Sequence, residues 1–372
     1  MKIPFKILLL LFSVSFLTLN EVRAQSERDW VSFSKHPILT GYGFKKLGHP
    51  ELFQGNQKHK KYFEGWYFKM VSADGSSILS IIPGISLSHD GKEQHAFIQI
   101  IDGKSAKTDY YPFPIGDFSF SKKEFAIKIG QNYFSKNKIL LNIHSDSSSV
   151  TGEIRMSKQV CLSSPKILNP GIMGWYRFVP FMQCYHGVVS LTHKLEGYLV
   201  KNGKDYNFNQ GIGYIEKDWG SSMPSAWIWM QSNNFHKGNS SFMLSIANVP
   251  WLGKPFTGFL GFFLNDSTLY RFATYTHAKL SLTESGSDTT KITITDRKNT
   301  YSIVAVRNNS GLLRAPVKGS MDRRIAESID AKLHLNVRDR KGKIIFDDST
   351  SIAGFEKVGD QKILEGVHKK RN

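Results

Sequence analysis

The chain has 372 residues, of which 40% are hydrophobic and 13% aromatic, and its formal net charge is +18. A chain of this length can bury one large core or two smaller ones, and its aromatic content excludes an intrinsically disordered protein. The basic residues are scattered through turns and a C-terminal HKKRN sequence, which argues against a nucleic-acid-binding protein. The charge favours attraction to an anionic membrane surface, although solvated turn lysines would produce the same composition.

The first 24 residues have the pattern of a secretory signal peptide. Lys2 and Lys6 precede an apolar run at about 7–19, and the sequence V-R-A lies just before Gln25, as at a signal-peptidase cleavage site. The apolar run is shorter than the ~20 residues that a transmembrane helix needs. We therefore predict that residues 1–24 are removed and that the mature protein is periplasmic or extracellular, with peripheral membrane contact at most.

From Tyr62 onward, short runs rich in Ile, Val, Phe, Tyr and Thr alternate with turn sequences. Asp-Gly at 74–75 and Asn-Gly at 202–203 favour the positive φ of hairpin turns. The segment Lys291–Arg297 (KITITDR) alternates apolar and polar residues as a half-buried strand does. The sequence therefore predicts an all-β protein whose antiparallel strands close into barrels, because closure buries one face and removes exposed edges.

The alternation stops at 157–184, where three prolines fall. This stretch predicts a crossover linker between an N-terminal β unit at 28–156 and a C-terminal β unit at 185–352, followed by a basic tail at 353–372. Two barrels in tandem are the simplest interpretation, and one large barrel is the alternative.

The two cysteines, Cys161 and Cys184, allow two interpretations. An oxidising compartment would permit a disulfide between them, whereas two small buried side chains are the alternative. Neither lies in a Cys/His cluster with metal-ligand spacing, and His186 and His193 would lie on opposite faces of a strand. We expect neither a metal ion nor an organic cofactor.

The sequence GYIEKDWGSSMPSAWIWMQSNNF, residues 213–235, combines two carboxylates with three indoles. Period-two alternation in a strand places Glu216 and Asp218 on one face and the neighbouring lysine and indole on the other. After a turn, Trp227 and Trp229 share a face of a second strand, which we expect to lie beside the first, within the C-terminal unit. Two carboxylates so close raise the pKa of one of them, although exposed charges and core indoles are the alternative interpretation.

Four segments resemble the tocopherol cyclase family. They are KYFEGWYFKM at 61–70 and residues 173–199, 213–235 and 315–335. The likeness extends over about 41–352, and the segment at 213–235 is its most specific part. The resemblance implies two lipocalin-like β-barrels. It also implies closure of a prenylated quinol to a chromanol, without redox change or a bound cofactor.

Such a reaction protonates a trisubstituted alkene to a tertiary carbocation, which the neighbouring phenol oxygen captures. It needs a carboxylic acid that keeps its proton, aromatic faces beside the cation and an acceptor for the phenol proton. We predict Asp218 as the proton donor, with Glu216 as the second choice. The side chains expected to bind the substrate are Trp219, Trp227, Trp229, Glu64, Trp66, Tyr67, Tyr185 and His193.

Three of these predictions carry alternatives. Glu64 is expected either to pair with an arginine such as Arg324 or to line the ligand cavity. Trp66 also has the position of an indole that closes the end of a barrel. Tyr185 and His193 are candidates for the base that receives the phenol proton.

A different class of function fits the same residues. A lipocalin-like carrier would bind a hydrophobic isoprenoid or fatty ligand without transforming it, and its indoles would supply only burial and stacking. A hydrophobic, prenylated small molecule is the expected partner in either case.

Overall fold

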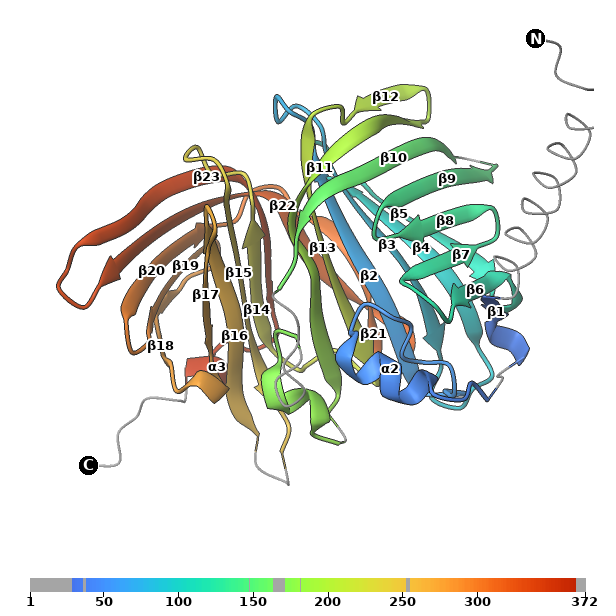
Figure 1. The fold of residues 1–372 in the computed structure, drawn as a ribbon, viewed down its shortest axis with the longest axis horizontal. Coiled ribbons are helices and arrows are strands. Elements are labelled where there is room, and N and C mark those ends of the chain that lie inside the picture. The colour runs from blue at the N-terminus through green and yellow to red at the C-terminus, as the bar shows by residue number, and fades with distance from the viewer. Residues whose placement is uncertain are drawn as a thin grey trace, which may run out of the picture.

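The structure, a computed structural model, describes residues 29–35, 38–146, 148–162, 171–180, 182–251 and 255–365. Two antiparallel sheets account for the strands of this part of the chain (Figure 1), and the predicted all-β class is confirmed. The predicted signal peptide at 1–24 lies outside the described residues. No helix in the described ranges is long and apolar enough to span a membrane.

The first sheet has thirteen strands, in the order β1-β6-β7-β8-β9-β10-β11-β13-β2-β3-β4-β5, with β12 beside β11. These strands are β1 (Trp30–Ser32), β2 (Tyr62–Val71), β3 (Ile78–Leu87), β4 (Gln94–Asp102), β5 (Thr108–Pro114), β6 (Phe118–Ser121), β7 (Ala126–Ile129), β8 (Asn132–Ser135), β9 (Lys138–Ser145), β10 (Ser148–Val160), β11 (Cys184–Lys201), β12 (Lys204–Asn207) and β13 (Gly211–Gly220). The strands at the two ends of this ladder are β1 and β5.

The second sheet has ten strands, in the order β17-β16-β15-β14-β23-β22-β20-β19-β18, with β21 beside β22. These strands are β14 (Trp227–Ser232), β15 (Ser240–Val249), β16 (Phe256–Asn265), β17 (Thr268–Ala273), β18 (Lys279–Ser285), β19 (Thr289–Thr295), β20 (Asn299–Val306), β21 (Gly311–Val317), β22 (Ser320–Asp339) and β23 (Ile344–Val358). Because β23 continues to Val358, the tail predicted at 353–372 begins inside a strand.

The two sheets divide the chain between Gly220 and Trp227. The predicted linker at 157–184 therefore does not coincide with the division, nor do the predicted units at 28–156 and 185–352. The reason is that β11 follows the proline-rich segment but pairs with β10 and β13, and β13 pairs with β2. Alternation within a strand indicates which face is buried, but it carries no signal for the partner with which the strand pairs.

Each sheet curls around a core of its own, and a third cluster lies where the two sheets meet. The first core contains Trp66, whose ring stacks on Phe125 at a centroid distance of 5.6 Å. The third cluster joins Tyr67 of β2 and Tyr214 of β13 to Trp229 of β14, so it draws on both sheets. The surface between the sheets is thus the place where aromatic side chains from both halves of the chain converge.

Short helices gather at one end of the molecule, along the lower edge of Figure 1. They include α2 (Tyr42–Gly48), a 3-10 helix at Gly174–Phe178 and α3 (Lys362–Glu365). Arg177 ties the first two together, because its Nη2 donates to the carbonyl oxygen of Lys46 at 3.2 Å and to Gln54 Oε1 at 2.7 Å. This end of the fold is therefore built from several segments that are distant in sequence.

The two cysteines are free in the structure, so the disulfide that the sequence permitted is not formed. Cys184 Sγ instead lies 3.9 Å from Met223 Sδ. The alternative interpretation of Cys161 and Cys184 as small, partly buried side chains agrees with their intermediate burial.

Candidate active site

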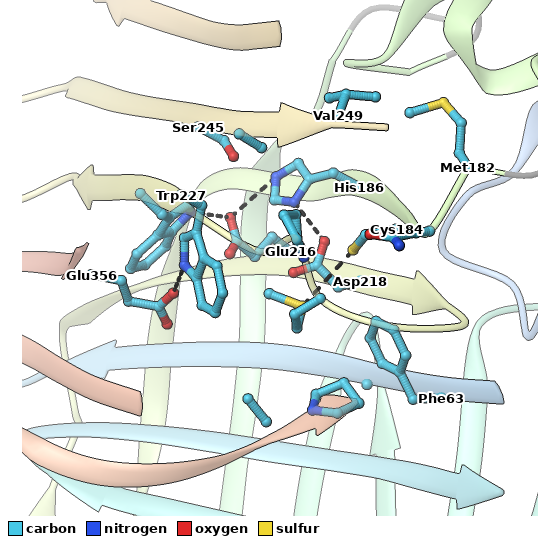
Figure 2. A pocket seen from close by; sticks show the side chains of 18 of the residues that line it. Phe63, Met182, Cys184, His186, Glu216, Asp218, Trp227, Ser245, Val249 and Glu356 are labelled. Atoms are coloured by element: carbon cyan, nitrogen blue, oxygen red, sulfur yellow. Dashed lines mark hydrogen bonds and ion pairs between the residues drawn. The ribbon is translucent and has the colours of Figure 1, made fainter. Parts of the chain in front are cut away.

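A pocket of about 210 Å³ lies between the two sheets (Figure 2). Its walls come from strands of both sheets: β2, β3, β4, β11 and β13 of the first, and β14, β15, β16, β21, β22 and β23 of the second. Most of the lining is apolar, including Phe97, Phe256 and Leu313. Four carboxyl groups also line it, and they belong to Glu216, Asp218, Glu327 and Glu356.

Glu216 and Asp218 share the pocket face of β13, as the alternation predicts. Lys217 and Trp219 point to the opposite face: Lys217 Nζ lies over the rings of Trp66 and Trp219, at 4.5 and 5.0 Å from their centroids. Trp219 belongs to the first core and is not among the residues that line the pocket. Only the two carboxylates of this strand segment are therefore placed to meet a ligand.

His186 connects these two carboxylates. It lies opposite Asp218 in the pairing of β11 with β13, and its Nδ1 is 2.8 Å from Asp218 Oδ1, while its Nε2 is 3.5 Å from Glu216 Oε2. Burial opposes the charge on the imidazole, but the two carboxylates outweigh it and raise the pKa of His186 to about 9. At neutral pH a charged imidazolium therefore bridges Asp218 and Glu216.

The carboxyl group of Glu216 is almost fully enclosed. Its Oε2 accepts a hydrogen bond from the Tyr214 hydroxyl at 2.7 Å and another from Trp229 Nε1 at 3.2 Å. Burial raises the pKa of Glu216 to about 7, although His186 acts in the opposite direction. Glu216 is therefore a carboxyl group that gains and loses a proton close to neutral pH.

The indoles of Trp227 and Trp229 both line the pocket. Trp227 Nε1 donates to Glu356 Oε2 at 2.5 Å, and Figure 2 shows this pair on the opposite side of the pocket from Asp218. β14 pairs with β15 and β23, so the expectation that it lies beside the strand of Glu216 in one unit is wrong. The two strands face each other from different sheets, because the turn at 221–226 crosses from one sheet to the other.

Glu327 and Glu356 form a second acidic pair that the sequence analysis missed. They are opposite each other in the pairing of β22 with β23, and the Tyr67 hydroxyl donates to Glu327 Oε1 at 2.6 Å. Burial raises the pKa of both carboxyl groups, and the charge of Glu356 raises the pKa of Glu327 further. Two neighbouring buried carboxyl groups do not both ionise readily, so this pair favours holding a proton. The only available sequence signal was that Glu327 falls within the segment 315–335.

Tyr67 is the remaining predicted residue that lines the pocket. Its ring meets that of Trp229 edge-on at a centroid distance of 5.4 Å, and the hydroxyl of Ser80 donates to its oxygen at 2.8 Å. The structure thus brings Tyr67 together with Glu216, Asp218 and the two indoles of β14.

Glu64 and Trp66 lie elsewhere, in the first core. Both are fully buried, and Glu64 Oε1 is 2.5 Å from Lys217 Nζ, so its partner is this lysine and not Arg324. Trp66 Nε1 donates to the carbonyl oxygen of Glu51 at 3.0 Å. Neither side chain is among those that line the pocket, which agrees with the packing interpretation of Trp66.

Tyr185 and His193 are also apart from the pocket lining. Tyr185 stacks on Trp219 at a centroid distance of 5.6 Å, and its hydroxyl donates to the carbonyl oxygen of Val179 at 2.8 Å. His193 is buried beside Ser190, and burial lowers its pKa to about 3. The structure therefore does not bring either candidate base together with the two carboxylates of β13.

One nitrogen of His186 and one oxygen each of Glu216 and Asp218 lie within 4.8 Å of one another. Among the described residues, this is the group whose donor atoms could hold a metal ion. A histidine ligates a metal only when it is neutral, whereas the two carboxylates favour the protonated imidazole here. The charge balance supports an ion-pair network at this position.

The fold and the pocket define a class of protein: an all-β chain with two antiparallel sheets and an apolar, acid-bearing pocket between them. A family model described as tocopherol cyclase-like matches residues 120–359 of the chain. The protein belongs to this family.

Relatives and solved structures agree only distantly with this chain. The chloroplastic tocopherol cyclase of Zea mays is 27% identical over 74 residues, which are 20% of this chain and 16% of the maize protein. Kievitone hydratase from Nectria haematococca has a TM-score of 0.45 at 10% identity, covering 80% of this chain and 89% of the other. CghA has a TM-score of 0.48 at 8% identity, covering 82% of this chain and 90% of the other.

Proposed function

We propose that the protein closes a prenylated benzoquinol to a chromanol by acid catalysis in the pocket between the sheets. Membership of the tocopherol cyclase-like family supports this reaction class. The observation that carries the proposal is the environment of Glu216, a buried carboxyl group with a raised pKa that shares an apolar pocket with Trp227 and Trp229. A proton donor and aromatic faces in one enclosed space are what the reaction requires.

The first step transfers the proton of Glu216 to the less substituted carbon of the prenyl double bond. A C–H bond forms, the π bond breaks, and the other carbon becomes a tertiary cation. The indole faces of Trp227 and Trp229 stabilise this charge, because cation–π attraction is strongest where water is excluded. The hydrogen bonds that both indoles donate to carboxyl oxygens hold the rings in place.

The second step forms the C–O bond of the chromanol ring. The phenol oxygen attacks the cation and releases its proton to Asp218, whose side chain is 29% exposed and faces the pocket. The Nε2–H of the His186 imidazolium then returns a proton to Glu216, whose Oε2 lies 3.5 Å away, and Asp218, which is partly exposed, releases the phenol proton to solvent. The neutral imidazole regains a proton from solvent at the same Nε2, while its Nδ1–H stays on Asp218. Protons balance over the cycle, and the product is an isomer of the substrate.

This assignment exchanges the predicted roles of the two acids. Glu216 is the proton donor because it is enclosed and its pKa is raised, whereas Asp218 is partly exposed and paired with the His186 imidazolium.

The function is tested by incubating the mature protein with a phytyl-benzoquinol in D₂O and separating the products by liquid chromatography with mass spectrometry. We expect a chromanol that carries one deuterium on carbon, because the alkene receives the proton of an acid that exchanges with solvent. A protein-free incubation is the control for spontaneous closure. Tight binding of the quinol with unchanged recovery, for every prenyl chain length tried, would contradict the proposal and favour a carrier.

The rate of ring closure is expected to fall as the pH rises through about 7. The active form of Glu216 is protonated, so the rate is at its plateau below the pKa of about 7 and declines above it by up to tenfold per pH unit. His186, whose pKa is raised to about 9, keeps its charge over the same interval. The measurement is kcat between pH 5.5 and 8.5, and a rate that increases over this range would contradict the assignment of Glu216 as the acid.

A further inference from the structure

Exposed apolar side chains concentrate at the end of the molecule that carries the short helices. The side chains of this apolar rim are Phe44, Leu47, Trp175, Phe178, Trp251 and Ile363. Phe44 is 85% exposed and Trp175 is 49% exposed. Single exposed apolar residues are ordinary, but a group of them with several aromatic rings marks a surface that meets a partner.

The four segments that supply the apolar rim are adjacent in space. Figure 1 places α2, α3, the 3-10 helix (bright green) and the adjoining ends of β15 and β16 along the same lower edge. The ring of Tyr176 in the 3-10 helix lies 6.4 Å from that of Phe256, where β16 begins. Thr257 Oγ1 in turn donates to the carbonyl oxygen of Ile363 in α3 at 3.4 Å. The apolar rim therefore runs across both halves of the fold.

The pocket reaches the same end of the molecule. Tyr176 and Met173 line it from the segment around the 3-10 helix, and Val249, Pro250 and Phe256 line it from the adjoining ends of β15 and β16. Pro250 is exposed and directly precedes Trp251 of the apolar rim. Figure 2 shows Val249 and Met182 together on one side of the pocket, beyond His186. An apolar molecule could therefore pass from the apolar rim to the acidic residues along an apolar path.

Positive charge accompanies the apolar rim. Lys45 is exposed beside Phe44 in α2, and its Nζ donates to the carbonyl oxygens of Lys122, at 3.3 Å, and of Lys123. This contact brings two further exposed lysines to the apolar rim. Lys362 is exposed beside Ile363, and the whole chain carries a formal net charge of +18. Lysines near an anionic bilayer are attracted to its surface, and aromatic rings insert at the interface.

We propose that the apolar rim inserts into the surface of an anionic lipid bilayer and sets the edge of the pocket against the lipid. A lipid-soluble ligand then enters the pocket without crossing bulk water. This goes beyond the proposed function, because the same docking would serve a carrier and does not depend on ring closure. The net charge alone predicts attraction to an anionic membrane, whereas this proposal names the residues that make the contact.

The test is sedimentation of the mature protein with vesicles in the absence of any quinol. The vesicles are phosphatidylcholine alone or an equal mixture with phosphatidylglycerol, and the variant of the apolar rim is Phe44→Ser with Trp175→Ser. The control variant is Tyr198→Ser with Ile344→Ser, because these side chains are 61% and 48% exposed and lie on β11 and β23, away from the apolar rim. Circular dichroism checks that both variants are folded.

We expect the wild type and the control variant to bind the anionic vesicles and the variant of the apolar rim to bind them at least tenfold more weakly. Raising the salt concentration should weaken the binding without abolishing it, because the inserted rings are not screened. Equal losses in the two variants, or a wild type that does not sediment with anionic vesicles, would overturn the proposal. Because no turnover is measured, neither result bears on ring closure.

Discussion

Replacing Glu216 with glutamine is expected to lower kcat for ring closure by about 10²–10⁴-fold, the usual contribution of a positioned general acid. Glutamine keeps the shape and can still accept the hydrogen bonds of Tyr214 and Trp229 at its carbonyl oxygen, but it supplies no proton to the alkene. Binding of the quinol should change by no more than a few fold, because the apolar lining is untouched. Chromanol formation and quenching of tryptophan fluorescence by the quinol measure the two effects separately.

The matched control is Glu153→Gln, which makes the same chemical change in an exposed ion pair on β10, where Glu153 Oε2 is 2.7 Å from Lys138 Nζ. This variant should keep the wild-type kcat. If Glu216→Gln also keeps it, the acid is not Glu216, and the paired carboxyl groups of Glu327 and Glu356 become the donors to test. If both variants lose binding as well as turnover, the effect is one of folding and not of proton transfer.

Replacing Lys217 with methionine is expected to lower the free energy of unfolding by about 3–5 kcal/mol, the usual effect of breaking a buried ion pair. Lys217 and Glu64 are fully buried, with 2.5 Å between Nζ and Oε1. Without the ammonium group, the carboxylate of Glu64 keeps only neutral donors, the backbone amides of Gln54 and Gly55 and the hydroxyl of Tyr62. Urea unfolding followed by tryptophan fluorescence measures the loss.

Two further variants test whether the loss of stability comes from breaking the buried ion pair. Lys138→Met breaks the exposed pair with Glu153 and should cost no more than about 1 kcal/mol, because solvent screens such a pair. Adding Glu64→Gln to Lys217→Met should recover part of the stability, since the uncompensated charge is removed. A loss in Lys217→Met no larger than that in Lys138→Met would show that the buried pair contributes little.

Local alternation was sufficient to predict one face of the candidate site. Glu216 and Asp218 share a strand face with period two, and both line the pocket, while Lys217 and Trp219 point into the first core, as the same period requires. Trp227 and Trp229 follow the same rule on β14. These relations involve residues at most a few positions apart, so the backbone geometry of an extended chain is enough to set them.

Other members of the site depend on strand pairing across long stretches of chain. His186 meets Asp218 only because β11 pairs with β13, and Glu327 meets Glu356 only because β22 pairs with β23. From the sequence, His186 was considered only as a metal ligand and rejected as one, and neither glutamate was singled out. The period within one strand carries no information on which strand pairs with it or in which register. These contacts could therefore not be predicted from the sequence.

The amino-acid sequence by itself determined the all-β class and the choice of face in the strands of Glu216 and Trp227, because alternation and turn residues act through the nearest neighbours in the chain. Only the tertiary structure decided that the strands divide between Gly220 and Trp227 and that the pocket lies between the sheets instead of inside one unit. Sheet membership and sheet packing arise from many weak contacts between distant segments, and each of these contacts is compatible with several local patterns. The network of His186 with Glu216 and Asp218 therefore forms because of the packing of distant segments. The sequence contains the three residues but does not predict that they meet.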